Sequence, residues 1–127
     1  MNETISITGL FFGLFAVLLG AFGAHGLKRV VAVEAISSFE AGIKYQMYHA
    51  LFLMLLSMLP NVAVETKNIV FYLVVVGIVL FSGSIYFLAT NTLTAFDFKK
   101  IGFITPIGGT LLISAWGYLA FSIITKK

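Results

Sequence analysis

The chain contains no cysteine and little charge. Its 127 residues include eight Lys or Arg, five Asp or Glu and two His, so only 10% of the sequence is charged. Without cysteine there are no disulfides, thiolate metal sites or cysteine nucleophiles, and two histidines with five acids supply few metal ligands. A soluble globular domain has about 25% charged residues. The composition therefore excludes an ordinary soluble domain, and we expect neither a metal site nor a cofactor.

Motifs typical of enzymes are also missing. The sequence has no His-Glu-x-x-His, no Gly-x-Ser-x-Gly and no glycine-rich loop ending in Lys-Ser or Lys-Thr. The hydroxyl groups of Ser82 and Ser84 have no candidate base in their sequence context. The net charge of +3 comes from basic residues spread over the connections and the C-terminus, as in membrane proteins. We expect neither catalysis nor nucleic-acid binding.

Long apolar stretches dominate the sequence instead. Hydrophobic residues make up 60% of it and the mean hydropathy is +1.05. A helix needs about 20 apolar residues to cross a hydrocarbon core about 30 Å thick, and four uncharged windows approach or exceed that length. We predict one all-α domain over residues 1–127, an integral membrane bundle of four transmembrane helices. The predicted spans are residues 5–24, 45–59, 68–90 and 106–125.

The segment between the first two spans has a different pattern. From Val33 to Lys44, apolar residues alternate with polar and charged ones at helical spacing. This predicts an amphipathic helix between helices 1 and 2, either lying in the membrane interface or running directly into the second span. We expect Gly26 to end the first helix in a left-handed conformation and Gly42 to allow a bend.

Small residues recur along the spans and would let neighbouring helix backbones approach closely. In the first span we expect Leu at Gly13 or Gly20 to disrupt packing and Leu at Gly9 to be tolerated. Packing within the chain is the first interpretation of this stripe, and a seam between two copies is the alternative. The predicted helix-packing glycines are Gly9, Gly13, Gly20, Gly83, Gly108 and Gly109.

Four spans with short connections must alternate in direction. The chain ends and the turn at Pro60 then share one side of the membrane, side A, and the other two connections share side B. Side B carries five basic residues (28, 29, 44, 99 and 100) against three on side A (67, 126 and 127). The positive-inside rule therefore predicts side B in the cytoplasm and both termini outside.

Polar residues gather on side B. We expect His25 and His49 to lie in one cluster, with Gln46 flanking the same groove as His49. Ordinary explanations also hold: tyrosines anchor at membrane interfaces, and histidines within spans form hydrogen bonds between helices. Trp116 is expected to serve packing, with its N–H needing a partner such as a backbone carbonyl or a serine side chain. The candidate polar cluster comprises His25, Tyr45, Gln46, Tyr48, His49, Asp97 and Thr105.

Sequence blocks touching all four predicted spans carry a family resemblance. The chain resembles the small bacterial membrane proteins catalogued as domain of unknown function 423, to which the transmembrane protein 256 group looks related. The resemblance implies an integral protein of the bacterial inner membrane and brings no assigned activity. Its blocks are residues 20–27, 45–51, 82–86, 105–109 and 116–117.

Two function classes follow for a protein whose environment is membrane lipid. One is a module that binds or moves a small polar molecule, a proton or a lipid head group at the side-B cluster. The other is a structural or accessory subunit of a homo-oligomer or a larger membrane assembly. An enclosed pocket that reaches His49 would favour binding, whereas a fully hydrogen-bonded His49 and a broad apolar face would favour the accessory role.

Overall fold

The computed structural model describes residues 2–91 and 102–125, and within these ranges the chain is helical without strands. The prediction of an all-α fold is confirmed. The helices are α1 (Asn2–His25), the short 3-10 helix η1 (Leu27–Arg29), α2 (Val33–Met58), α3 (Val64–Ala89) and α4 (Ile104–Thr125).

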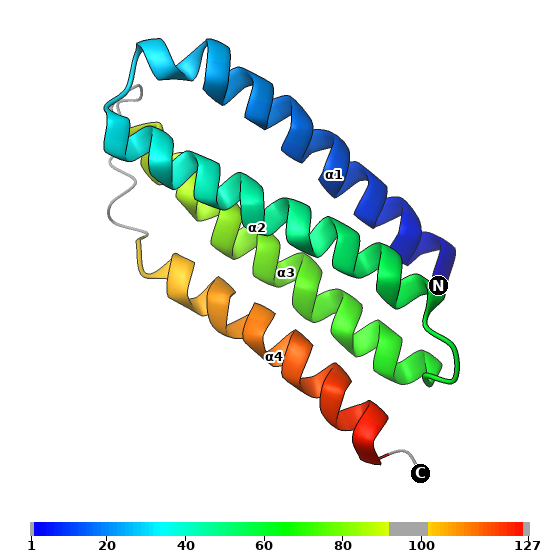
Figure 1. Cartoon of the computed structure of the whole chain (residues 1–127). Helices are drawn as coiled ribbons and strands as arrows, with labels where there is room; N and C mark the ends of the chain where they lie inside the picture. Colours follow the sequence, from blue (N-terminus) through cyan, green and yellow to red (C-terminus); the bar gives the residue numbers. More distant parts are fainter. Residues whose placement is uncertain (1, 92–101, 126–127) are drawn as a thin grey trace.

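Consecutive long helices run antiparallel (Figure 1). α1 packs against α2, α2 against α3, and α3 against α4, so α1 and α4 lie on opposite sides of the central pair (Figure 1). The start of α1, the α2–α3 turn and the end of α4 lie at one end of the bundle, as predicted for side A. Asn61 in that turn has a φ of 60°, which agrees with the turn expected at Pro60 and Asn61.

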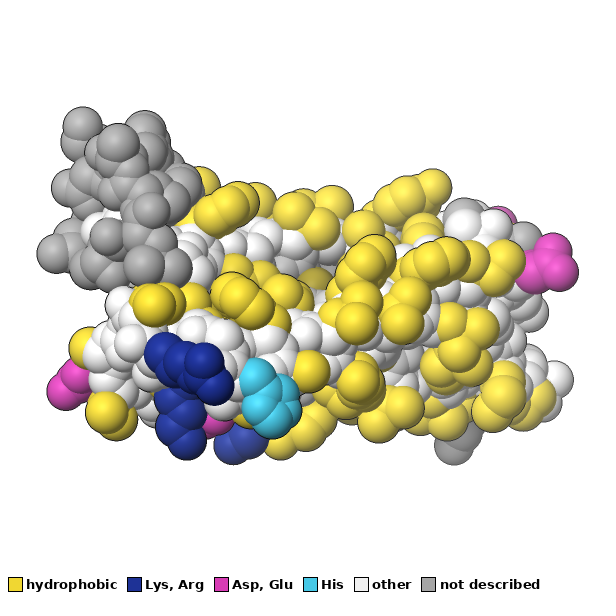
Figure 2. Space-filling view, turned by 90° about the horizontal axis from the view of Figure 1, so that it is seen from above, with side chains coloured by type: hydrophobic (Ala, Val, Ile, Leu, Met, Phe, Trp, Pro, Cys, Tyr) yellow, Lys and Arg dark blue, Asp and Glu magenta, His cyan; other side chains and the backbone are white. Residues whose placement is uncertain are grey.

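Among the residues that the structure describes, three helices are long and apolar enough to cross a membrane. They are Asn2–Arg29, Val64–Ala89 and Ile104–Thr125, whose apolar windows have mean hydropathies of 2.2, 2.4 and 1.7. α2 has sufficient length at 26 residues, but polar residues such as Lys44 and Gln46 lower its hydropathy. Figure 2 shows apolar side chains over the middle of one face and charged side chains toward its ends, as expected for a membrane protein.

The amphipathic segment does not form a separate interfacial helix. α2 is continuous from Val33 to Met58, so of the two arrangements considered the segment runs directly into the apolar half of the helix. No break in the helix occurs at Gly42, where α2 packs closely against α3: a Cβ there would lie 2.8 Å from Cε1 of Tyr86. Packing against α3 therefore holds the two halves of α2 in one helix.

The predicted left-handed conformation at Gly26 is also wrong. Gly26 has a φ of −101°, and its N–H donates to the carbonyl of Phe22 at 2.8 Å. The chain continues directly into η1, where Leu27 is fully buried in a cluster with Phe39 and Ala89. Burial of Leu27 draws the connection back onto the bundle, so the first helix ends in a tighter right-handed turn.

The core lies along the inner face of α3. Val70, Val74 and Ile78 recur every four residues on this face, which is the spacing of one side of a helix. They pack with Leu53 on α2 and Leu112 on α4. This shared core places α3 between the two helices that carry the candidate site.

Along α1, the order of glycine tolerance that we predicted is reversed. A Cβ at Gly9 would lie 2.9 Å from the carbonyl oxygen of Ala50, whereas at Gly13 the nearest atom would be 3.8 Å away. At Gly20 a Cβ would meet no heavy atom of the described residues within 4 Å. Of these three glycines, Gly9 therefore lies closest to the backbone of α2. At Gly23, in the last turn of α1, the Phe39 ring fills the space.

Between α3 and α4 the predicted glycines also differ from one another. A Cβ at Gly108 would run into the backbone nitrogen of Phe81 and lie 2.8 Å from the carbonyl of Gly77. At Gly109 it would make an ordinary contact, 3.5 Å from the Phe81 ring. A Cβ at Gly83 would meet no atom of the described residues within 4 Å. Close packing thus needs Gly108 and the unpredicted Gly77, but neither Gly109 nor Gly83.

Candidate functional site between α2 and α4

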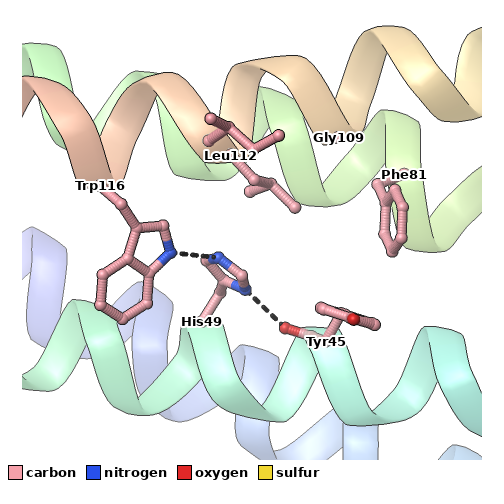
Figure 3. A pocket seen from close by; sticks show the side chains of 7 residues that line it. Tyr45, His49, Phe81, Gly109, Leu112 and Trp116 are labelled. Atoms are coloured by element: carbon pink, nitrogen blue, oxygen red, sulfur yellow. Dashed lines mark hydrogen bonds between the residues drawn. The ribbon is translucent and has the colours of Figure 1, made fainter.

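His49 connects α2 to α4 through hydrogen bonds on both ring nitrogens. Its side chain is buried, with 4% of its surface exposed. Nδ1 lies 2.7 Å from the carbonyl oxygen of Tyr45, and the indole N–H of Trp116 donates to Nε2 at 3.0 Å (Figure 3). A carbonyl only accepts and an indole N–H only donates. The imidazole is therefore the neutral tautomer that carries its hydrogen on Nδ1.

A pocket of about 310 Å³ lies beside this pair. At one end Tyr45 and Phe81 meet edge to face at 5.2 Å, and at the other His49 and Trp116 meet at 5.9 Å (Figure 3). Tyr45 and Trp116 are each about half exposed, so the pocket opens at the outer surface between α2 and α4. Its lining comprises Tyr45, His49, Phe81, Gly109, Leu112, Ile113 and Trp116.

Gln46 belongs to a different contact, in which α2 meets α1 and α3. Its Nε2 donates to the carbonyl of Phe12 on α1 at 2.8 Å, and the hydroxyl of Tyr86 on α3 donates to its Oε1 at 2.6 Å. The predicted groove shared with His49 is not formed. Three residues of helix leave about 60° between two side chains, and here that angle directs them to different neighbouring helices.

The two histidines do not share a site. His25 is exposed at the end of α1. It lies 13 residues, or about 20 Å along the axis, beyond Phe12, which contacts Gln46. The predicted pairing assumed that the second span enters the membrane near Tyr45 at the depth of His25, but α2 is already helical from Val33. His49 consequently lies much deeper in the bundle than the connection that holds His25.

Basic side chains surround the exposed end of α1. Lys28 and Arg29 form the last turn of η1 and are exposed, and Figure 2 shows a histidine beside Lys and Arg side chains on this face. Cations at a helix C-terminus interact favourably with its dipole. Lys28 and Arg29 are therefore favourably placed at this helix end, and His25 lies in the same exposed region.

The remaining candidates are dispersed. Tyr48 is exposed and touches Tyr45 edge to face at 5.7 Å. The hydroxyl of Thr105 shares a short hydrogen bond with Ser84, which ties the start of α4 to α3. Asp97 lies outside the described residues. Of the predicted cluster, the structure brings together Tyr45 and His49, with Tyr48 at the rim.

Trp116 is the site residue that sequence reasoning assigned to packing alone. Its ring stacks on Phe52 with centroids 4.2 Å apart, and its N–H binds His49 rather than the expected carbonyl or serine. The available signal was that a buried indole N–H and a buried imidazole each need a partner. Within the described ranges, no three potential metal ligands come together.

A buried lysine marks the opposite end of the bundle. Lys67, expected in a connection, is in the first turn of α3 with 5% of its surface exposed. Its Nζ donates to the carbonyl of Ser57 at 3.4 Å, in the last turn of α2, where carbonyls lack helical partners. The Ser57 hydroxyl accepts from Ser6 on α1 at 2.9 Å. This group joins three helices at side A and is structural.

Comparisons with known proteins agree on one family. The family model described as protein of unknown function (DUF423) matches residues 19–109. UPF0382 membrane protein SSP2132 of Staphylococcus saprophyticus is 41% identical over 87% of this chain and 88% of its own length. A UPF0382 membrane protein of Haemophilus influenzae is 38% identical over 99% of this chain and 97% of its own length. UPF0382 inner membrane protein YgdD of Escherichia coli is 33% identical over 91% of this chain and 85% of its own length. No solved structure matches the chain.

Proposed function

Because the chain belongs to the family of membrane proteins described as protein of unknown function (DUF423), we propose that it crosses the cell membrane four times and binds a membrane-soluble molecule between α2 and α4. The single observation that carries the binding proposal is the pocket beside His49 and Trp116.

The partners of the polar residues of α2 support a fourth span. Gln46 and His49 are 6% and 4% exposed, and their hydrogen bonds reach α1, α3 and α4. Polar side chains that are bonded to neighbouring helices are tolerated within a bilayer. The 26 residues of α2 extend about 39 Å, more than the hydrocarbon core of about 30 Å. α2 also lies between α1 and α3, both apolar enough to cross.

Cysteine labelling tests the number and direction of the spans, since the native chain has no cysteine. Ala63→Cys places a thiol in the exposed α2–α3 turn and Lys28→Cys places one in exposed η1. In spheroplasts, we expect a membrane-impermeant maleimide to label Ala63→Cys fully and Lys28→Cys only after lysis. The reverse pattern would contradict the orientation with side B in the cytoplasm. Labelling of both thiols before lysis would contradict the crossing of α2.

The position of the pocket supports a ligand that arrives from the bilayer. Ligand sites typically enclose about 300–1,000 Å³, and this pocket of about 310 Å³ is lined by apolar and aromatic groups. Its open side lies between exposed parts of two membrane helices, where lipid is the solvent. Because both nitrogens of His49 are bonded, the arrangement supports binding over proton transfer.

Filling the pocket tests its role. Gly109 lines the pocket, and a Cβ there would lie 3.5 Å from the Phe81 ring, so Gly109→Leu should occupy the pocket without separating α3 from α4. We expect mass spectrometry of the purified protein to show a several-fold loss of a copurifying lipid-soluble compound. Gly117→Leu is the matched control, because a Cβ at exposed Gly117 meets no described atom within 4 Å. An unchanged set of compounds in Gly109→Leu would refute the pocket.

An accessory role is the second candidate, and the complete hydrogen bonding of His49 favours it. The outer faces of α1 and α4 also present large exposed apolar side chains, including Phe11, Phe15 and Phe121. In the same purification, a membrane protein recovered in stoichiometric amount with no bound small molecule would support this role instead.

A further inference from the structure

We propose that the pocket between α2 and α4 selects molecules that are apolar except for a hydroxyl group, such as a long-chain or isoprenoid alcohol. This inference rests on the proposed binding function and names its ligand class. It is based on one donor and one acceptor that face each other at the wall of an apolar pocket. The donor is the N–H of Trp116 and the acceptor is Nε2 of His49.

A hydroxyl is the smallest uncharged ligand group that can enter this hydrogen bond and keep both partners satisfied, because a single oxygen both accepts and donates. It would accept from the Trp116 N–H and donate to His49 Nε2, because a hydroxyl has one donor and two acceptor sites. A ketone, ester or ether oxygen only accepts, so Nε2 would lose its partner. An ammonium group only donates, so the indole N–H would lose its partner. A buried polar group left without a partner weakens binding.

The α2 helix itself determines which ring nitrogen of His49 is the hydrogen-bond acceptor. The carbonyl of Tyr45 lies 2.7 Å from Nδ1 of His49 and only accepts, so it holds the ring hydrogen on Nδ1 and leaves Nε2 bare. The preference for a donating ligand is therefore built into α2. This preference is present before the ligand binds, because His49 is already held in one tautomer.

The surroundings of Trp116 allow the pair to open. The indole is 50% exposed and is carried by α4, which packs chiefly against α3. Making room for a hydroxyl would need the ring to turn toward the lipid, away from the Phe52 ring that it contacts at 4.2 Å. Leu112 and Ile113 would then contact the apolar part of the ligand, and its remaining chain would leave through the open side into the bilayer.

The protein provides its own reporter, because Trp116 is its only tryptophan. The purified full chain in lipid vesicles would be titrated with farnesol and, separately, with farnesyl methyl ether, while Trp116 emission is recorded. We expect a saturable change with farnesol and about tenfold weaker binding of the ether, a difference of about 1.4 kcal/mol. The comparison uses the wild-type protein and needs no variant to fold.

Two variants sharpen the result. Gly109→Leu should abolish the response to both compounds, and Gly117→Leu should leave it unchanged. Equal binding of the alcohol and the ether would overturn the hydroxyl proposal while leaving the pocket in place. An absent response to both, or a response that Gly109→Leu does not reduce, would overturn the binding function and this inference with it.

Discussion

Gly108→Ala is expected to destabilise the protein by about 3 kcal/mol, the upper end of the range for overpacked cores. The added Cβ would run into the backbone nitrogen of Phe81, and it would lie 2.8 Å from the carbonyl of Gly77 and 2.9 Å from the carbonyl carbon of Leu80. All three atoms belong to the backbone of α3 and cannot rotate away. The two helices must therefore separate along a contact that contributes much of the core, and the thermal midpoint in detergent should fall accordingly.

Gly109→Ala is the matched control for this change. It lies on the same helix, and its Cβ would make an ordinary contact 3.5 Å from a side-chain ring. Alanine is intrinsically favoured over glycine in a helix by about 1 kcal/mol, and this gain applies to both variants, so their difference isolates the steric contact. Circular dichroism measures the thermal midpoint of each variant. Equal thermal midpoints for Gly108→Ala and Gly109→Ala would show that the close approach of α3 and α4 does not determine stability.

The difference between these adjacent glycines shows what helical spacing alone can predict. Small residues mark where two backbones are able to approach, but the crossing geometry decides which ones do. A Cβ at Gly9 would press on the backbone of α2, whereas a Cβ at Gly20 on the same helix would meet no described atom within 4 Å. Crossing positions depend on contacts between helices that are distant in sequence. For this reason local composition was enough to predict a helix in the region of α3 (Val64–Ala89), while the order of the glycines along α1 was wrong.

The candidate site was predictable in part for the same reason. Tyr45 and His49 are four residues apart on one helix, so their shared face follows from helical periodicity. Trp116 is 67 residues from His49, and no local pattern determines how α4 is rotated relative to α2. The start of α2 was equally undetermined, because an amphipathic segment is compatible with an interfacial helix or with an extension of the span. The continuity of α2 from Val33 to Met58 distinguishes the two arrangements.

Gln46→Leu should have the second largest effect, a loss of about 2 kcal/mol. The side chain connects α2 to α1 through the Phe12 carbonyl and to α3 through the Tyr86 hydroxyl. Hydrogen bonds between membrane helices contribute about 0.6 kcal/mol on average and up to about 1.7 kcal/mol. Leu has nearly the volume of Gln, so the loss should come from these two bonds rather than from a cavity, and the thermal midpoint in detergent measures it.

A double-mutant cycle with Tyr86→Phe separates the two bonds of Gln46. The Tyr86 hydroxyl donates to Oε1 at 2.6 Å, so Tyr86→Phe should destabilise the native protein by about 1 kcal/mol and should have almost no effect once Gln46 is Leu. Tyr72→Phe on the same helix is the control, because Tyr72 is exposed and its loss of a hydroxyl should leave stability unchanged. Additive effects of Gln46→Leu and Tyr86→Phe would mean that this bond does not couple α2 to α3. The burial of Gln46 within a membrane helix would then depend on the Phe12 carbonyl alone.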